Sequence, residues 1–321
     1  MEPGRIGWIG TGRMGLQLAS RLLDAGYPLA VYNRTRDKAV PLLERGALLV
    51  ERPRDLAGCD VVCSIVSTSE VFATVMLGED GLLSGSGPVP RIVVDSSTIS
   101  QEVSAQVGEA AAELGTALLN APVSGSPKVV AAGRLGMVVS GPQAAFDEVA
   151  PVLAELAASV TYVGEGTRAR LVKICHNLLL AIVTQALAET TVLAEKAGIA
   201  RADYLGFVNG SVMGSVFTRY KTPALVSRAY EPSFTGHLLR KDVTLGLDAA
   251  AALDTPLPLT AEVAARLDDL IDAGLGGLDF AALLELAAQQ AGFTPAVEDA
   301  AAVDDGLTPQ RRVERPAEAG S

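Results

Sequence analysis

The sequence predicts an α/β fold in which an N-terminal doubly wound parallel sheet is followed by an all-α C-terminal domain, the two joined by one long interdomain helix. Three observations predict it. A glycine-rich turn follows an apolar stretch at residues 6–9, strand-like and helix-like segments alternate as far as Val163, and the alternation stops at Gly166. Alternating strands and helices indicate a parallel sheet with helices on both faces.

The first apolar stretch, Ile6–Ile9, leads directly into the run Gly10-Thr11-Gly12-Arg13-Met14-Gly15. Gly10 permits a tight turn, Gly12 lets backbone N–H groups approach a pyrophosphate, and Gly15 lets the next helix pack against its strand. The N-terminus of that helix directs its dipole at the phosphates. In this setting we expect a Rossmann-type dinucleotide site. A purely structural glycine-rich turn is the alternative.

The end of the second expected strand, Leu29–Tyr32, indicates which dinucleotide binds, because it is followed by Asn33, Arg34 and Thr35. An NAD site normally has an Asp or Glu here for the ribose 2′-OH, whereas an NADP site lacks that carboxylate and offers a cation to the 2′-phosphate. Asn33 does not repel a phosphate, and Arg34 can bind one through paired donors. We therefore predict NADP (NADPH) rather than NAD. The alternative is that Arg34 is an ordinary solvated charge.

Further apolar segments continue the alternation of strands and helices across residues 1–165, which we assign to the NADP-binding domain. The expected strands are Ala47–Val50, Val61–Val66, Ile92–Asp95, Ala117–Leu119, Met137–Ser140 and Val160–Val163, and the expected helices include Gln101–Leu114 and Ala144–Leu156.

The pattern changes after Gly166. Thr167–Ala197 is apolar nearly all round and contains no Gly or Pro, which predicts one long buried helix ended by Gly198. The rest of residues 166–293 lacks strand patterns, so we expect a helical substrate and dimerisation domain. From Thr294 the composition turns to Pro, Ala, Glu, Asp and Arg, and we expect residues 294–321 to form a disordered tail.

Composition restricts the partners. The 321 residues carry a formal net charge of −11, which argues against nucleic acids and anionic membranes. Cys59, Cys63 and Cys175 lack metal-ligand spacing and lie in apolar runs, so we expect buried thiols in a reducing compartment. We find no signal peptide or transmembrane span in the pattern and predict a cytoplasmic protein.

Polar loops follow two neighbouring strands of the expected sheet. Asp95-Ser96-Ser97-Thr98 closes one strand, and the next is followed by Asn120-Ala121-Pro122-Val123-Ser124-Gly125-Ser126. In an open α/β sheet the ligand crevice lies outside the carboxyl ends of the strands. The Ser124–Ser126 turn offers backbone N–H groups and hydroxyls to a carboxylate. The alternative is an ordinary loop in which Ser126 caps a helix that begins at Pro127.

Lys173 lies within the apolar run Leu171–Cys175. A lysine there must reach water or be held by partners, because burying an unpaired charge is costly. A lysine whose pKa is lowered by burial can act as a general acid or base, and a rim lysine is the alternative. Asn177 lies one helical turn further on the same face, and His176 is expected to support its neighbours. We expect no metal site.

Taken together, these motifs resemble the β-hydroxyacid dehydrogenase family, which includes 3-hydroxyisobutyrate dehydrogenase and glyoxylate/succinic semialdehyde reductase. The resemblance covers about residues 4–292 and rests on four features: the Gly10–Gly15 loop, the Asn33–Thr35 run, the Asn120–Ser126 motif and the spacing of Gly166, Lys173 and Asn177. There are two departures. Asn120 stands where the family has Asp, and Ser126 stands where it has a second Gly.

The resemblance implies roles for individual residues. Lys173 would be the catalytic general acid/base, and the substrate would contact Thr98, Ser124, Gly125 and Asn177. The cofactor would contact, near its nicotinamide, Val66, Thr98, Phe234 and Lys241. Asp242 would support the cleft, although an adjacent Lys and Asp form a solvated face on pattern alone. The Lys173–Asn177 run also resembles 6-phosphogluconate dehydrogenase, but the chain is too short for that enzyme's doubled helical domain.

We therefore predict an NADP-dependent oxidoreductase that transfers a hydride between nicotinamide and a small 3-hydroxy acid or its semialdehyde, with Lys173 exchanging the proton on oxygen. One alternative is an NADPH-dependent reductase of a bulkier carbonyl compound or imine, and another is a non-catalytic NADP-binding scaffold protein on the same fold. The long apolar helix needs further cover, so we expect a homodimer or homotetramer.

Overall fold

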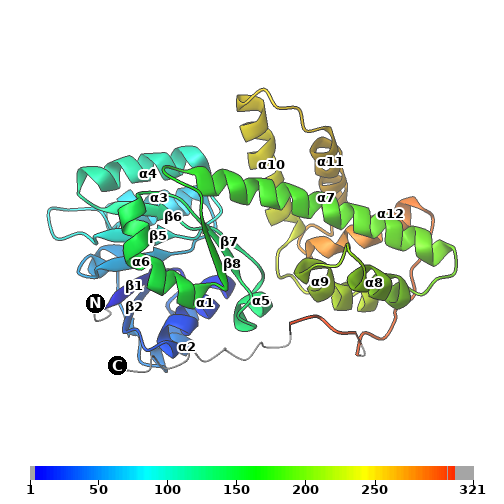
Figure 1. The fold of residues 1–321 in the computed structure, drawn as a ribbon, viewed down its shortest axis with the longest axis horizontal. Coiled ribbons are helices and arrows are strands. Elements are labelled where there is room, and N and C mark those ends of the chain that lie inside the picture. Colours follow the sequence, from blue (N-terminus) through cyan, green and yellow to red (C-terminus); the bar gives the residue numbers. More distant parts are fainter. Residues whose placement is uncertain (1–3, 302, 308–321) are drawn as a thin grey trace, which may run out of the picture.

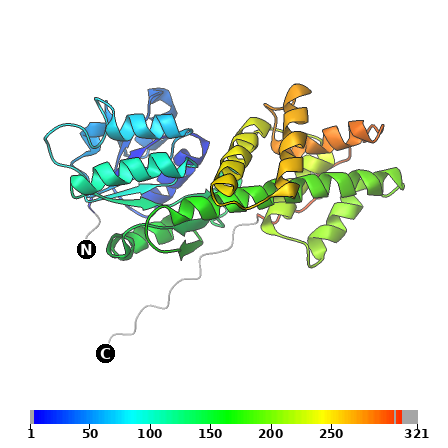
Figure 2. The same cartoon turned by 90° about the horizontal axis from the view of Figure 1, so that it is seen from above.

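The computed structural model describes residues 4–301 and 303–307, which form two lobes joined by one long helix (Figures 1 and 2). The N-terminal lobe contains the sheets, and the described residues of the C-terminal lobe form helices and their connections. Helix α7 (Arg168–Lys196) begins beside the sheets and continues through the second lobe. The expected fold class is confirmed.

Six parallel strands form the main sheet, in the order β3-β2-β1-β4-β5-β6. The strands are β1 (Ile6–Ile9), β2 (Leu29–Tyr32), β3 (Leu48–Leu49), β4 (Val61–Ser64), β5 (Ile92–Asp95) and β6 (Ala117–Asn120). Ile6 of β1 pairs with Leu29 on one side and with Val61 on the other. The strand order therefore reverses between β1 and β4, where sheets of this kind bind their ligands.

Helices cover both faces of the main sheet because its strands are apolar on both sides. Helices α1 (Arg13–Asp24) and α6 (Gln143–Leu156) pack on the face that buries Trp8. Helices α3 (Ser69–Leu77) and α4 (Gln101–Glu113) pack on the face that buries Val62. Shorter helical segments complete the connections: η1 (Arg36–Ala39), α2 (Val40–Leu43) and η2 (Pro53–Leu56).

A small second sheet takes the place of the expected continuation of the main sheet. Its strands are β7 (Val123–Ser124), β8 (Gly136–Val139) and β9 (Ser159–Tyr162), with β8 antiparallel to β7 and parallel to β9. Helix α5 (Pro127–Ala131) connects β7 to β8 and packs against α1. The sequence predicts β8 and β9 but not β7, because two residues are too few to show a period of two.

The second lobe is built around α7, against which four other helices pack. The helical segments of this lobe after α7 are α8 (Arg201–Gly210), α9 (Val216–Ser227), α10 (Gly236–Ala252), α11 (Pro258–Asp272), η3 (Phe280–Ala282) and α12 (Leu283–Gln290). By length and composition α7 could cross a membrane, but one side of it forms the core of this lobe.

Helix α7 is not buried all round, which corrects the expectation drawn from its composition. Leu179 is 61% exposed and Leu193 is 71% exposed. Cys175 is also exposed, whereas Cys59 and Cys63 are buried as expected. An apolar stretch of 3.6-residue period needs only one covered face, so composition alone overestimates burial.

The chain after α12 makes specific contacts as far as it is described. The Glu298 carboxylate accepts hydrogen bonds from the backbone N–H groups of Arg201 and Ala202, both at 2.9 Å. Leu307 is only 8% exposed. In the described residues 294–301 and 303–307 these contacts tie the chain to the helices, whereas composition alone predicts a disordered tail. The other residues of the expected tail, 302 and 308–321, lie outside the described residues.

Candidate active site

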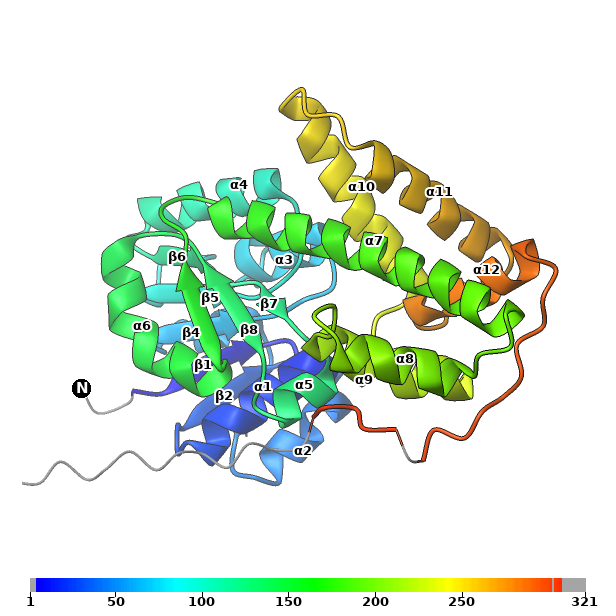
Figure 3. The same cartoon turned by 45° about the vertical axis from the view of Figure 1, so that its right-hand side comes forward.

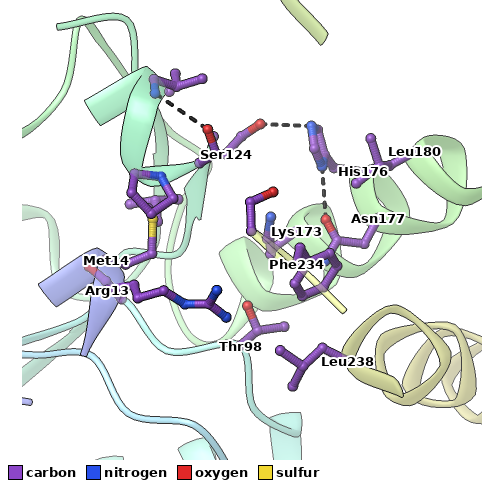
Figure 4. Close-up of a pocket in the computed structure, with 18 of the residues that line it drawn as sticks. Arg13, Met14, Thr98, Ser124, Lys173, His176, Asn177, Leu180, Phe234 and Leu238 are labelled. Carbon is purple, nitrogen blue, oxygen red and sulfur yellow. Dashed lines mark hydrogen bonds between the residues drawn. The ribbon is translucent and has the colours of Figure 1, made fainter. Parts of the chain in front are cut away.

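A cavity of about 500 Å³ lies between the two lobes, outside the carboxyl ends of β1 and β4 (Figure 4). The glycine-rich loop bounds one side, the turn after β7 bounds another, and α7, α9 and α10 supply the helical side. Many of the residues singled out in the sequence line this cavity: Gly12, Arg13, Met14, Gly15, Val66, Thr98, Ser124, Gly125, Lys173, Asn177, Phe234 and Lys241.

The remaining expected cofactor residues lie next to the cavity, where β1 and β2 end. The Asn33 side chain accepts a hydrogen bond from the Thr11 N–H at 2.8 Å and donates to the Thr35 carbonyl at 2.7 Å. The Gly10 N–H donates to the end of β2. Arg34 is exposed beside them. Asn33 therefore holds the glycine-rich loop against the loop that carries Arg34.

The glycine-rich loop leaves room for a phosphate group. Gly12 lines the cavity, and a Cβ atom built on it would meet no protein atom within 4 Å. A Cβ atom on Gly15 would collide with the Gly10 carbonyl and push α1 away from β1. Because α1 begins at Arg13, its first backbone N–H groups lie at the loop. The loop fits the pyrophosphate of a dinucleotide.

Lys173 extends from α7 into the cavity (Figure 4). Burial lowers the pKa of Lys173 from 10.5 to about 8; the Asp242 charge opposes this shift and the Lys241 charge adds to it. Asp242 acts through space, since no hydrogen bond joins Lys173 to a described residue. A lysine with this pKa exchanges its proton readily near neutral pH.

A directional chain of hydrogen bonds runs beside Lys173 from Asp242 to Ser124. Asn177 donates from Nδ2 to the Asp242 carboxylate at 2.5 Å. Because a carboxylate only accepts, this contact turns the Asn177 Oδ1 toward Nδ1 of His176, 3.0 Å away. His176 then donates through Nδ1, and its Nε2 accepts from the Ser124 hydroxyl at 2.8 Å. Burial, together with the Lys173 charge, lowers the pKa of His176, which favours this neutral imidazole.

Lys241 and Asp242 do not form the solvated face that the pattern alone indicates. Asp242 is 1% exposed. The Lys241 Nζ lies 3.0 Å from the Asp242 carboxylate and donates to the Thr98 carbonyl at 3.0 Å. Thr98 follows β5, so this contact joins the two lobes at the cavity. Asp242 therefore contacts both Asn177 and Lys241 and holds their side chains beside the cavity.

A buried ion pair that the sequence pattern does not reveal anchors α7 beneath the site. Arg170 is 2% exposed, its Nη2 lies 2.6 Å from the Asp95 carboxylate, and its Nη1 donates to the Ser97 carbonyl at 2.6 Å. The Ser97 hydroxyl donates to Asp95 at 2.7 Å and accepts from the Val66 N–H at 2.8 Å. The network fixes the loops that carry Val66 and Thr98. The sequence signal for this ion pair is an arginine in an apolar helix, because Asp95 lies 75 residues from Arg170.

The two departures from the family motif have different structural meanings. Asn120 is 3% exposed, donates to the Gly166 carbonyl at 3.1 Å and accepts from the Ser104 hydroxyl. An aspartate only accepts, so the amide suits a position that must do both. Ser126 lines the cavity, and its hydroxyl accepts from the Val129 N–H as the N-cap of α5. The helix-capping alternative is therefore confirmed for Ser126.

Helix α9 supplies an apolar wall that was not anticipated from the sequence. Val216, Phe217 and Tyr220 line the cavity. On the same helix, the buried Lys221 lies 2.5 Å from the Asp279 carboxylate, which also accepts hydrogen bonds from Ser233. Burial disfavours the ionised Asp279, but the Lys221 charge and these hydrogen bonds outweigh it and lower its pKa.

Comparison with known proteins covers both lobes. Residues 5–164 match the family model for the NAD binding domain of 6-phosphogluconate dehydrogenase, and residues 167–287 match the model described as NAD-binding of NADP-dependent 3-hydroxyisobutyrate dehydrogenase. A 3-hydroxyisobutyrate dehydrogenase of Pseudomonas aeruginosa is 32% identical over 291 residues, covering 88% of this chain and 97% of that protein. Glyoxylate/succinic semialdehyde reductase 1 of Arabidopsis thaliana is 28% identical, covering 87% and 97%.

Solved structures agree with these matches. The crystal structure of a 3-hydroxyisobutyrate dehydrogenase from Salmonella typhimurium has a TM-score of 0.79 at 28% identity and covers 88% of this chain and 99% of that one. An imine reductase from Pseudomonas sp., with a TM-score of 0.61 at 22% identity and coverage of 88% and 99%, shares the fold. The chain therefore belongs to the β-hydroxyacid dehydrogenase family, as an NAD(P)-binding oxidoreductase of the 3-hydroxyisobutyrate dehydrogenase type.

Proposed function

We propose that this protein is an NADP-dependent oxidoreductase that interconverts a small 3-hydroxy acid and its semialdehyde. The observation that carries the proposal is Lys173, which extends into the cavity with a pKa of about 8, between the glycine-rich loop and the Ser124–Gly125 turn. When bound, the nicotinamide cofactor supplies or accepts the hydride. The protein supplies orientation and a proton.

Lys173 is the proposed general acid/base. In the reducing direction its ammonium group donates a proton to the carbonyl oxygen of the substrate, and in the oxidising direction its neutral amine accepts the proton of the hydroxyl group. A pKa of about 8 leaves both forms accessible near neutral pH. This is the pKa range in which a general acid/base works best at a working pH near 7–8.

The polar groups around Lys173 orient the substrate. Asn177 has two amide protons, of which one goes to Asp242, and the other is available to a substrate oxygen. We assign the substrate carboxylate to the Ser124–Gly125 turn, with the Thr98 side chain on the facing loop. The chain of bonds through His176 holds the Ser124 hydroxyl in place.

NADP specificity is supported by the end of β2. Asn33 stands where an NAD site has a carboxylate, and the exposed Arg34 is available for a 2′-phosphate. Arg36, two residues on, pairs instead with Glu51. A structural relative, Psf3, was solved in complex with NADP+ and 2-OPP, with a TM-score of 0.78 at 27% identity and coverage of 88% of this chain and 99% of that one.

We also propose a cytoplasmic homodimer or homotetramer that acts on a small-molecule carboxylate and engages neither nucleic acid nor membrane. The exposed apolar side chains of α7, Leu179 and Leu193, support self-association because such surfaces are usually covered. Light scattering on the purified protein tests it, and a mass equal to 33.1 kDa would mean a monomer.

A reductase of a bulkier carbonyl compound is the second candidate function. It is favoured by apolar side chains that line the cavity, namely Val129, Val216, Phe217 and Tyr220. A non-catalytic scaffold has less support, because nothing in such a role requires a lysine in the cavity.

Initial rates separate these functions. Purified protein is assayed with NADPH and NADH against glyoxylate, short semialdehydes, branched ketones and cyclic imines, and in reverse with 3-hydroxy acids. The proposal expects the highest kcat/KM with NADPH and a semialdehyde that carries a carboxylate. A higher kcat/KM on an imine or an uncharged ketone would support the second candidate. Turnover of no compound, with NADPH bound tightly, would support the scaffold.

A further inference from the structure

The chain beyond the family match returns from the helical lobe to the sheet lobe. The family model ends at residue 287, and we define the C-terminal strap as residues 294–301 and 303–307. The strap leaves α12, passes α8 and α9, and reaches α5 (Figure 3). The strap therefore lies outside the part of this chain that matches the family model.

The first half of the strap is fixed to the helical lobe by charged groups. Glu298 accepts hydrogen bonds from the first backbone N–H groups of α8. Arg201, which is fully buried, donates to the Ala296 carbonyl, and Arg228 donates to the Pro295 carbonyl. These contacts set the direction in which the strap leaves the lobe.

The last described residue of the strap contacts both lobes. Leu307 is buried in a small apolar cluster with Val129 and Ala132, both of the α5 region in the sheet lobe. Val216 and Tyr220 of α9, in the helical lobe, pack against the same cluster. One leucine side chain thus fills the space between α5 and α9.

The neighbouring backbone adds a polar contact and a close approach. Arg134, which lines the cavity, donates to the Gly306 carbonyl. Gly306 has a φ of +64°, and a Cβ atom on it would meet the Arg219 side chain of α9 at 2.8 Å. Glycine therefore suits this position both for its left-handed backbone and for its fit against α9.

We infer that the C-terminal strap is a specificity-determining element that sets the width of the substrate pocket; this inference rests on the proposed function. Val129, Arg134, Val216 and Tyr220, which the strap contacts, all line the cavity. Leu307 packs against both α5 and α9. The Gly306 carbonyl accepts a hydrogen bond from Arg134 and so holds its guanidinium at the pocket wall. With the strap in place the pocket favours small substrates over bulkier ones. Without it, α5 and α9 separate and small substrates lose contacts.

The direct test compares Leu307→Asp with Val297→Asp, since Val297 lies in the same strap but is 73% exposed. For each variant, kcat and KM are measured on a small semialdehyde and on a branched one. We expect Leu307→Asp to raise KM for the small substrate about tenfold, with a smaller change in kcat, because lost wall contacts weaken ground-state and transition-state binding alike. The ratio of kcat/KM should shift toward the branched substrate. Val297→Asp should match the wild type.

Two truncations locate the effect. A chain ending at Leu307 keeps every described strap contact and should behave as the wild type. A chain ending at Asp305 loses Gly306 and Leu307 and should reproduce Leu307→Asp. Leu307→Ala provides a milder variant if the aspartate prevents folding. Equal substrate ratios in all of these chains would overturn the inference.

Hydrogen–deuterium exchange on the NADPH complex gives a readout that needs no substrate. Leu307→Asp should accelerate exchange in α5 and in the first turn of α9, while exchange in α12 stays unchanged and Val297→Asp changes neither region. If the wild type turns over none of the compounds in the initial-rate assay, the proposed function fails. The hydrogen–deuterium exchange then decides by itself whether the strap holds α5 and α9. Unchanged exchange in both helices would overturn the inference that the strap holds α5 and α9 together.

Discussion

Lys173 on α7 and Lys221 on α9 are two lysines in desolvated surroundings near the same cavity, and they differ in their partners. Lys221 lies 2.5 Å from the Asp279 carboxylate and 4.3 Å from the centre of the Phe280 ring. No carboxylate of the described residues is hydrogen-bonded to Lys173, which extends into the cavity. A charge that leaves water needs a partner or gives up its proton. Under the proposed function, the carboxylate partner, more than the burial, separates the structural Lys221 from the reactive Lys173.

Removing Lys173 should produce the largest effect on activity. Lys173→Met should lower kcat about 10²–10⁴-fold, the range for loss of a general acid/base, while the Kd for NADPH stays close to that of the wild type. Lys173→Arg should not restore the rate, because a guanidinium keeps its proton at any working pH. Retention of more than about a tenth of kcat by the methionine variant would make Lys173 a rim lysine.

Removing Lys221 should instead affect stability. Lys221→Met leaves the Asp279 carboxylate buried without its cation, which should lower the free energy of unfolding by about 3–5 kcal/mol. Urea unfolding measures this change, and the double variant Lys221→Met with Asp279→Asn should recover part of it. A Lys221→Met protein with wild-type stability but a hundredfold lower kcat would reverse the roles assigned to the two lysines.

Arg34 extends the comparison to a cation whose proposed partner is the ligand. Arg34→Ala should weaken NADPH binding by about 1.5–3 kcal/mol, as expected for charge-assisted hydrogen bonds, and leave NADH binding nearly unchanged. Calorimetric titration with both cofactors tests this, with Arg36→Ala as the matched control because Arg36 pairs with Glu51. Equal losses for the two cofactors would show that Arg34 does not distinguish them.

The smallest expected effect is the stability cost of Lys173 itself. Burial lowers its pKa from 10.5 to about 8, so between these values the unfolded chain binds more protons than the folded one. Stability should therefore rise with pH through that window. Lys173→Met should remove this rise and stabilise the fold at neutral pH by about 1 kcal/mol, after allowing for solvent in the cavity. Thermal unfolding at several pH values checks the sign, and destabilisation at neutral pH would contradict it.

Local patterns in the sequence predicted much of the fold and the inner part of the site. The glycine-rich loop, most strands and the long helix follow from period and turn chemistry over short stretches. Lys173 and Asn177 lie on one helical face, so their proximity was predictable. Their roles came from the family resemblance.

Pairings between distant residues account for what the sequence did not predict. Arg170 and Asp95 are 75 residues apart, and Lys221 and Asp279 are 58 apart, so neither pair leaves a local pattern. Strand β7 is too short to show a period. Leu307 lies in a polar stretch whose composition indicates disorder, and its burial depends on a space between α5 and α9 that exists only in the folded chain.

The pH dependence of kcat in both directions, with saturating cofactor, tests the central claim about Lys173 most directly. The reducing reaction needs the ammonium form, so its kcat should fall above a pKa near 8, and the oxidising reaction needs the neutral amine, so its kcat should rise toward that same pKa. The Lys173→Met variant should show neither change between about pH 6 and about pH 10. An unchanged ionisation near 8 in this variant would contradict the account and assign the proton transfer to another group.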